Sequence, residues 1–339
     1  MKQLIHISLI LLVLSASFTQ SCRESEMKHN NLAEDTTMSL EVIEWSKKIN
    51  KHPENHEYLF HRAEALVSDQ KLDLALEDML RAIELNPSLE YHMYTADLQF
   101  ANDHTVKALE YYEKSVELSP LNEEALFKLA QFHFFVRQFD KSKAVFKKLI
   151  TENPSHADAS FHLGMMAKEE ADTAAAMAYF KKTISLLGSD YNSAMQLAAM
   201  YEAQNDERAL DYYNNAISID KNSDEAYYAR GLYYQKAGEK DKAILDYQLT
   251  VDLNPQHYLA YYNAGNIIAE EGSYDRAIEH FKLALKFNEN FAKAYNRIAQ
   301  CLELQGNLDL ALRNYERCLQ IEPNHQLAKE GIDRLSSIQ

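Results

Sequence analysis

The sequence lacks the short motifs that many enzymes and metal proteins carry. It has no HExxH or CxxC pattern for a metal, no GxSxG turn for a catalytic serine, and no glycine-rich loop for a phosphate. Neighbouring carboxylates such as Glu123 and Glu124 are typical of helix starts and solvent-exposed faces rather than of an acid–base pair. The sequence therefore predicts no catalytic residues, no metal site and no cofactor.

Basic residues are outnumbered by acidic ones. The chain has 35 lysines and arginines against 51 aspartates and glutamates, which gives a formal net charge of −16. It has no lysine or arginine stripe to follow a nucleic-acid backbone, so no nucleic-acid partner is predicted. An acidic excess is typical of a well-solvated surface, and it also leaves open a basic partner.

Proline is rare, and all six prolines fall in one register. They stand 34, 33, 34, 101 and 68 residues apart, so the last two gaps are about three and two times the first. The positions are Pro53, Pro87, Pro120, Pro154, Pro255 and Pro323. A fixed period of this size is typical of a repeat protein, in which each unit packs on its neighbours.

Small and large residues recur in the same register. A first small residue occurs at Ala63, Ala96, Ala130, Gly164, Ala198, Gly231, Gly265 and Ala299. A second occurs at Ala75, Ala108, Ser142, Ala176, Ala209, Ala243, Ala277 and Ala311. A large residue follows four positions later, at Met79, Tyr112, Phe146, Phe180, Tyr213, Tyr247, Phe281 and Tyr315. Small residues let helices approach closely, the large residue fills the space between them, and proline ends the second helix. The pattern predicts two short antiparallel helices per unit.

This set of small, aromatic and proline positions resembles the tetratricopeptide repeat family. The resemblance covers eight full units within residues 56–325 and implies an all-α fold, a right-handed α-solenoid of helix–turn–helix repeats. Three of the glycines, Gly238, Gly272 and Gly306, are expected in the turn between the two helices of a unit. Gly188, Lys221 and Glu289 stand where proline is usual.

Both ends of the repeat array need a cap, because a terminal unit otherwise exposes its packing face. Residues 38–55 are expected to form an N-terminal half-unit with Trp45 in the aromatic position. Residues 326–339 are expected to form a C-terminal capping helix. Its predicted apolar stripe is Leu327, Ile332, Leu335 and Ile338.

Residues 1–21 have the composition of a signal peptide, because the apolar run of residues 4–18 is short for a membrane-spanning helix. A small residue followed by Cys22 resembles the bacterial lipoprotein signal, which implies that Cys22 is the lipidated first residue; an ordinary cleaved signal peptide is the alternative. The following Arg23, Glu24 and Glu26 resemble Bacteroidetes-type lipoproteins and imply the outer membrane, on its periplasmic face or at the cell surface. Residues 22–37 are predicted to be a flexible tether.

The other two cysteines, Cys301 and Cys318, lie in the last repeat. An exported compartment permits a disulfide between them. Cys318, however, stands in a small packing position where alanine is usual, and a buried cysteine behaves as a small apolar residue. We therefore expect two buried thiols.

The resemblance implies that the first helix of each unit lines a concave groove. The residue three before the first small position gives the predicted partner-binding ladder: Phe60, Met93, Phe127, Phe161, Met195, Tyr228, Tyr262 and Asn296. These rings can anchor an extended peptide or helix of a partner; the alternative is that they pack mainly against the next unit. Glu64 and Asp97 flank the ladder at its N-terminal end, which disfavours the family's carboxylate-clamp role because like charges repel.

The sequence thus predicts a non-catalytic protein–protein interaction scaffold, anchored by lipid, that assembles or stabilises a complex of the cell envelope. The alternative is a peptide- or glycan-binding module that uses the groove. Its sugar-binding candidates are Tyr228, Tyr262, Asn263 and Asn266. Self-association through the end helices stays open.

Overall fold

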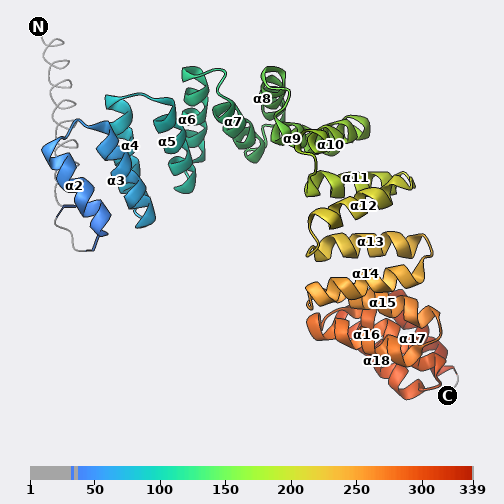
Figure 1. The fold of residues 1–339 in the computed structure, drawn as a ribbon. Coiled ribbons are helices and arrows are strands. Elements are labelled where there is room, and N and C mark those ends of the chain that lie inside the picture. The colour runs from blue at the N-terminus through green and yellow to red at the C-terminus, as the bar shows by residue number, and fades with distance from the viewer. Residues whose placement is uncertain (1–31, 34–36, 338–339) are drawn as a thin grey trace, which may run out of the picture. The chain divides into compact units, whose positions relative to one another are not determined.

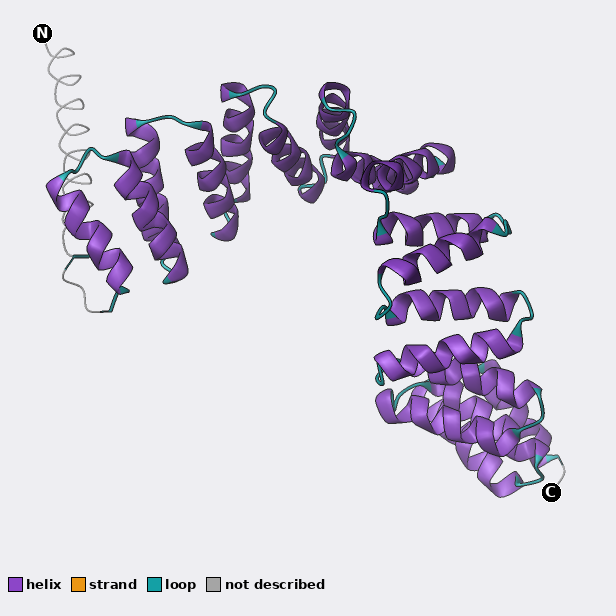
Figure 2. Cartoon of the chain, viewed as in Figure 1, coloured by secondary structure: helices purple, strands orange, loops and turns teal. Residues whose placement is uncertain are grey.

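The computed structural model describes residues 32–33 and 37–337, and within them it consists of helices and turns with no β-strand (Figures 1 and 2). The chain divides into two compact units, Met1–Ala159 and Ser160–Gln339. The helices of the N-terminal unit are α2 (Leu40–Lys51), α3 (His56–Ser68), α4 (Leu72–Leu85), α5 (Leu89–Ala101), α6 (Thr105–Leu118), α7 (Glu123–Phe135) and α8 (Phe139–Glu152). The unit boundary falls within α9 (Ala157–Glu169).

The C-terminal unit continues the same alternation of helices. Its helices are α10 (Thr173–Leu187), α11 (Tyr191–Ala203), α12 (Arg208–Ile219), α13 (Asp224–Lys236), α14 (Lys240–Leu253), α15 (Tyr258–Glu270), α16 (Tyr274–Phe287), α17 (Ala292–Leu304), α18 (Leu308–Ile321) and α19 (Gln326–Ser336). Each odd-numbered helix from α11 to α17 packs most extensively against the helix that follows it, as do α3, α5 and α7. We call these two partners the first and second helix of a repeat. The predicted all-α solenoid of tandem repeats is confirmed.

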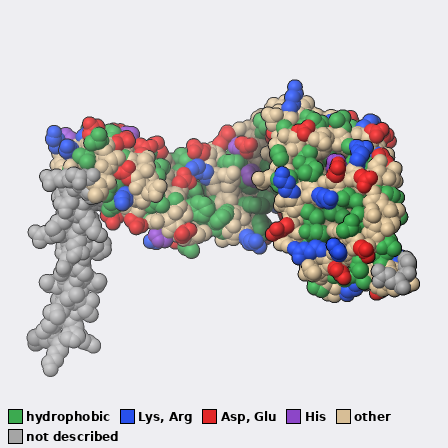
Figure 3. Space-filling model, turned by 90° about the horizontal axis from the view of Figure 1, so that it is seen from below, with side chains coloured by type: hydrophobic (Ala, Val, Ile, Leu, Met, Phe, Trp, Pro, Cys, Tyr) green, Lys and Arg blue, Asp and Glu red, His purple; other side chains and the backbone are tan. Residues whose placement is uncertain are grey.

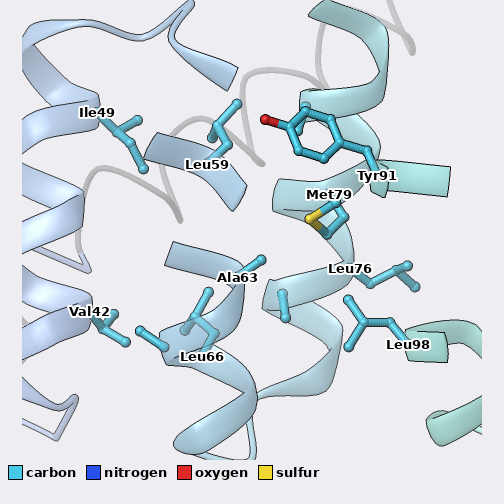
Figure 4. Packing of buried hydrophobic residues seen from close by; sticks show 12 residues of the cluster. Val42, Ile49, Leu59, Ala63, Leu66, Leu76, Met79, Tyr91 and Leu98 are labelled. Carbon is cyan, nitrogen blue, oxygen red and sulfur yellow. The ribbon is translucent and has the colours of Figure 1, made fainter. Parts of the chain in front are cut away.

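The recurring small and large positions form the core of each repeat. Met79, Phe146, Phe180, Phe281 and Tyr315 are fully buried, and so are the small residues that face them. In the N-terminal unit, Leu76 and Met79 of α4 lie between the side chains of α3 and those of α5 (Figure 4). The spacing of residue types in the sequence therefore identified the packing positions correctly.

Glycine is required at the first small position of some repeats. A Cβ added to Gly231 would lie 2.8 Å from the Tyr247 ring, and one added to Gly265 would lie 2.8 Å from the Phe281 ring. Because real Cβ atoms do not approach a ring this closely, the aromatic residue packs directly on the glycine backbone. The prediction that these glycines serve close packing is confirmed.

The turn between the two helices of a repeat always contains one left-handed residue. Gly238, Gly272 and Gly306 have φ of 80°, 80° and 79°. The residue at the same position of the five preceding repeats has φ between 53° and 60°: Gln70, Asp103, Arg137, Ala171 and Asn205. Only glycine adopts this conformation without a steric cost, so five repeats carry a local strain that the glycines avoid.

The N-terminal half-unit packs differently from a full repeat. Helix α2 buries Val42, Ser46 and Ile49, whereas Trp45 is only half-buried and its ring stacks on His61 at a centroid distance of 4.8 Å. Trp45 shares a helix face with Glu41, which is exposed, and burying that face would bury the carboxylate. Trp45 therefore packs at the edge of the core instead of filling the aromatic position as predicted.

The C-terminal cap buries Ala328, Gly331 and Leu335 of α19. A Cβ added to Gly331 would lie 2.5 Å from the Tyr315 ring, so the smallest residue faces the last aromatic residue of the array. The predicted stripe is wrong at Leu327, which is 53% exposed, because the close approach at Gly331 turns the neighbouring face inward. Ile332 is half-buried, and Ile338 lies outside the described residues.

Some of the predictions for the N-terminal segment concern residues that the structure does not describe. The predicted signal peptide and Cys22 lie outside the described residues. Leu32 and Ala33 are buried, so the tether prediction is wrong at these two positions, where an apolar pair interrupts a polar segment. None of the described helices is both long and apolar enough to cross a membrane.

The prediction for Cys301 and Cys318 is confirmed, because both are buried free thiols. Burial raises the pKa of the Cys301 thiol. Burial, followed by the charge of Glu322, raises the pKa of Cys318 to about 11.

Candidate functional site

The first helices of successive repeats contact one another within each unit. In the N-terminal unit, Lys128 Nζ on α7 lies 2.5 Å from Asp97 Oδ2 on α5. In the C-terminal unit, Arg297 Nε on α17 donates to Asn266 Oδ1 on α15 at 2.7 Å. The first helices therefore form a continuous layer in each unit, and we call its solvent-facing side the first-helix surface. On the face shown in Figure 3, hydrophobic side chains reach the surface between acidic and basic ones.

The predicted ladder residues lie at the inner edge of this surface. Met93 and Asn296 are buried, and the other six are half-buried. Phe60 stacks on Tyr91 at 5.2 Å, and Phe161 packs on Phe180 at 5.6 Å. These rings pack mainly inside the protein and offer only part of their surface to solvent. Their role in partner binding stays a prediction.

The residues named as sugar-binding candidates are engaged with other protein groups. Asn263 Nδ2 donates to the Tyr228 hydroxyl at 3.1 Å, and the Tyr228 ring lies 4.3 Å from that of His257. The Tyr262 ring packs against both Phe281 and Phe291, and Asn266 accepts the bond from Arg297 described above. The surface of this region is therefore already organised by internal contacts.

The most exposed aromatic surface lies in the N-terminal unit. Among the phenylalanine, tyrosine and tryptophan side chains that the structure describes, only Phe100, Phe135 and Phe139 are exposed, by 39%, 59% and 47%. The Phe100 ring meets Phe135 at 4.8 Å and Phe132 at 5.3 Å, both edge to face. Phe134 and Phe139 form a further edge-to-face pair at 5.4 Å. We call these five residues the phenylalanine patch.

The phenylalanine patch lies where α5 and α7 end and α8 begins. Buried Phe132 forms its floor, and the Tyr112 ring of α6 supports that floor at 4.9 Å. The patch was not predicted from the sequence, because its residues are not part of the repeated packing pattern. The unusual run of phenylalanines in residues 132–139 is the signal that would have found it.

Acidic side chains lie on the same helices as the patch. Asp97 lies one turn before Phe100, accepts a hydrogen bond from the Tyr112 hydroxyl and pairs with Lys128. Burial, together with the charges of Glu64 and Asp97, raises the pKa of Tyr94 to about 12. Burial and the charges of Glu90 and Glu57 likewise raise the pKa of Tyr91. Carboxylates thus surround both tyrosines of α5.

The C-terminal unit offers an open cavity of about 440 Å³ on its first-helix surface, between α15, α17 and α19. Tyr274, Arg297, Cys301, Leu304 and Arg334 contribute to its lining. Arg334 donates two hydrogen bonds of 2.9 Å to the Glu303 carboxylate, and Glu303 also accepts from the Tyr315 hydroxyl at 2.6 Å. The cavity is therefore apolar in part, with most of its charge neutralised internally.

Side chains able to ligate a metal do not converge in the described part of the chain. Across residues 32–33 and 37–337, no group of three or more His, Cys, Asp or Glu side chains is arranged to hold an ion.

Comparisons with known proteins place the chain among repeat proteins. Tetratricopeptide repeat profiles match residues 62–123, 127–190, 228–290 and 292–325, which together span more than half of the chain. No curated protein is similar enough in sequence to count as a match.

Solved structures share the fold at low sequence identity. The C-terminal part of a TPR repeat-containing protein from Cytophaga hutchinsonii is 14% identical, with a TM-score of 0.61 over 71% of this chain and 99% of that one. YrrB, described as a TPR protein with an unusual peptide-binding site, is 22% identical over 56% of this chain and 97% of its own, with a TM-score of 0.49. MamA is 24% identical over 49% of this chain and 92% of its own, with a TM-score of 0.46.

Proposed function

The chain belongs to the tetratricopeptide repeat family, and we propose that it is a non-catalytic scaffold that binds a segment of a partner protein on its first-helix surface. Proteins of this family generally mediate protein–protein interactions. The fold alone does not decide the partner, because the side chains on the surface select it.

The observation that carries the proposal is the phenylalanine patch. Aromatic residues are enriched at the centre of protein interfaces, where a few buried rings supply most of the binding energy. In this chain, nearly every aromatic side chain of the described residues is at least half-buried, yet three phenylalanines gather in the open on neighbouring helices. Exposed rings that meet one another, as Phe100 and Phe135 do, are typical of a partner-binding site on a protein of net charge −16.

The ladder residues are proposed to form the floor on which the partner lies, whereas its main anchors are elsewhere. Six of the ladder residues keep part of each side chain accessible: Phe60, Phe127, Phe161, Met195, Tyr228 and Tyr262. Met93 and Asn296 shape the surface from below. An extended peptide or a helix fits such a surface, because its side chains alternate between apolar anchors and solvent.

We further propose that a lipid on Cys22 anchors the scaffold in the cell envelope, at the outer membrane, where it assembles or stabilises a protein complex. The proposal rests on the sequence of residues 1–26, because a signal-like apolar run directly precedes the cysteine. Metabolic labelling with a palmitate analogue tests it: the wild-type chain should take up the label and Cys22→Ser should not.

Affinity capture tests the scaffold proposal. The wild-type chain and Phe100→Ser/Phe135→Ser would be recovered from gently solubilised envelopes, and the associated chains identified by mass spectrometry. Val106→Ser/Leu245→Ser is the matched control, since Val106 and Leu245 are exposed by 74% and 60% but lie on second helices. Phe127 and Phe161 are poor test positions because they pack on buried Phe146 and Phe180.

A discrete partner that is lost only in the phenylalanine variant supports the proposal. A partner that stays bound to every variant would place the interaction on another surface, and the absence of any captured protein would count against a scaffold.

A further inference from the structure

We infer that the first-helix surface of the N-terminal unit binds a basic amphipathic segment, with an apolar side chain on the phenylalanine patch and lysines or arginines beside the carboxylates of α3 and α5. The inference deepens the proposed function and rests on it, because it names the chemistry of the partner. It follows from the phenylalanine patch, the carboxylates on the same surface and the spacing between the patch and those carboxylates.

The patch is shaped to receive an apolar side chain. Phe100 and Phe135 meet edge to face, so the two rings stand at an angle of 76° to each other and leave ring surface open to solvent. Phe132 closes the bottom of this angle and is itself buried. An aromatic or branched aliphatic side chain can therefore gain contacts with several rings at once.

The charges on the same three helices are almost all negative. Helices α3, α5 and α7 carry the acidic residues Glu57, Glu64, Glu90, Asp97, Glu123 and Glu124. Their two long basic side chains are already paired: Arg62 is buried against Asp78, and Lys128 binds Asp97. Glu57, Glu64, Glu90 and Glu124 are exposed, and Glu64 also meets the His61 ring nitrogen at 2.9 Å. Acidic side chains thus outnumber lysines and arginines on this surface, which attracts a cationic segment.

The spacing between the two features defines the segment further. Phe100 and Glu90 are separated by ten residues of one helix, which corresponds to about 15 Å along its axis. A bound helix would place its apolar anchor and its outermost cation roughly ten residues apart, and an extended segment would need about four or five residues to cover the same distance.

The C-terminal unit provides an internal contrast. Its first helices α11, α13, α15 and α17 carry acidic residues together with Lys236, Lys293 and Arg297, besides Arg230, which is paired with Asp246. Both signs of charge alternate there, so that surface has no comparable preference for a cationic partner. The preference for a basic segment is therefore a property of the N-terminal unit.

Charge also argues against a second copy of this chain as the occupant of the patch. Each copy has a net charge of −16, so two copies repel each other overall. Self-association through the patch is an outcome that the test below separates from the binding of a basic segment.

The test uses two synthetic helical peptides with identical apolar residues, one carrying lysine at its charged positions and the other glutamate. Binding of each fluorescently labelled peptide to the full-length chain in neutral detergent is measured by anisotropy, with empty micelles as the blank. The lysine peptide should bind at least about tenfold more tightly than the glutamate peptide. Its affinity should fall as salt is raised, because the carboxylates lie at the surface.

Three variants locate the site. Phe100→Ala/Phe135→Ala should weaken binding of the lysine peptide by about tenfold or more. Glu64→Gln/Glu90→Gln should weaken it several-fold and reduce its salt dependence. The matched control is Val106→Ala/Leu245→Ala, which removes exposed apolar side chains from second helices and should leave the affinity unchanged. Helicity and thermal unfolding confirm that each variant is folded.

Equal binding of both peptides, stronger binding of the glutamate peptide, or no binding at all would overturn the inference. So would an equal loss in the control variant, or a dimer of the wild-type chain that dissociates on substitution of Phe100 and Phe135. These outcomes leave the proposed function standing if a cellular partner is still captured through a first-helix surface.

Discussion

Arg62 and Asp78 form a two-pronged ion pair in which neither side chain reaches solvent. The Arg62 Nε and Nη2 atoms donate to the two Asp78 carboxylate oxygens at 2.7 and 2.6 Å, and Nη1 donates to Ser46 Oγ at 3.1 Å. The same arrangement recurs in the C-terminal unit, where Arg230 donates to both Asp246 oxygens at 2.8 Å. Both pairs join the two helices of a repeat.

The two pairs should differ in what they contribute to stability. Arg62→Met removes the cation that faces the fully buried Asp78 carboxylate and should cost about 3–5 kcal/mol of unfolding free energy. Arg230→Met should cost less, because the Arg230 side chain is 18% exposed and water can approach the site. Urea unfolding followed by circular dichroism measures both. The double variant Arg62→Met/Asp78→Leu should recover much of the loss, and a double variant as unstable as the single one would contradict this explanation.

The left-handed turn position predicts a stabilising substitution. Ala171 has φ of 58°, a conformation that is costly for any residue with a Cβ. Ala171→Gly should therefore raise the unfolding free energy by about 0.5–1 kcal/mol, even though glycine also makes the unfolded chain more flexible.

The reverse substitution serves as the matched control for the turn. Gly272 has φ of 80° and no atom within 4 Å of an added Cβ, so Gly272→Ala tests backbone strain without a clash. It should lower the unfolding free energy by about 1 kcal/mol. Equal unfolding midpoints for both variants and the wild type would show that the left-handed turn position carries no such strain.

Buried tyrosine hydroxyls predict a loss of stability in alkali. Burial and the hydrogen bond to Glu202 raise the pKa of Tyr213, and burial and the bond to Glu303 raise that of Tyr315. Since the folded pKa lies above the ordinary value of about 10, the stabilising difference is present below pH ~10 and is lost as the pH rises towards the folded pKa. Urea unfolding at a series of pH values from neutral to strongly alkaline measures the decline.

A tyrosine variant isolates one hydroxyl. Tyr213→Phe loses the 2.8 Å bond to Glu202 and should cost about 1 kcal/mol near neutral pH. It should also flatten the alkaline decline, because one ionising group has been removed. An unchanged decline would show that Tyr213 does not contribute to it.

The two C-terminal thiols should react only when the protein unfolds. Cys301 and Cys318 are buried, and their raised pKa keeps them protonated, so neither is a good nucleophile at pH ~8. In the Cys22→Ser chain, a thiol reagent should titrate no cysteine under native conditions and both in denaturant. Rapid native labelling of either thiol would mean that the last repeat opens readily.

The repeat pattern could be predicted from the sequence because it depends on local geometry. A small residue, an aromatic residue and a proline at fixed spacing leave little freedom in how two helices pack, and residues such as Gly231 and Tyr247 lie where that spacing predicts. The phenylalanine patch could not be predicted in this way. Its exposure depends on where Phe100 and Phe135 point relative to a neighbouring repeat, and neither residue belongs to the pattern.

Departures at the ends have similar physical causes. Trp45 follows the register of the repeats, but the exposed carboxylate of Glu41 on the same face keeps it from the core. Leu327 fits an apolar stripe by periodicity alone, yet the close contact of Gly331 with Tyr315 selects another face of α19. The left-handed turns at Gln70 and Ala171 carry no sequence signal, because a residue other than glycine occupies a position that favours glycine.

Site-specific photo-cross-linking in the envelope tests most directly whether the first-helix surface binds a partner protein. A photoreactive phenylalanine analogue would replace Phe135 or Leu232 on first helices, and Val106 or Leu245 on second helices, all four of them exposed. The proposed function predicts a discrete cross-linked protein from a first-helix position and none from Val106 or Leu245. Cross-links that form only from the second helices, or from none of the four positions, would contradict it.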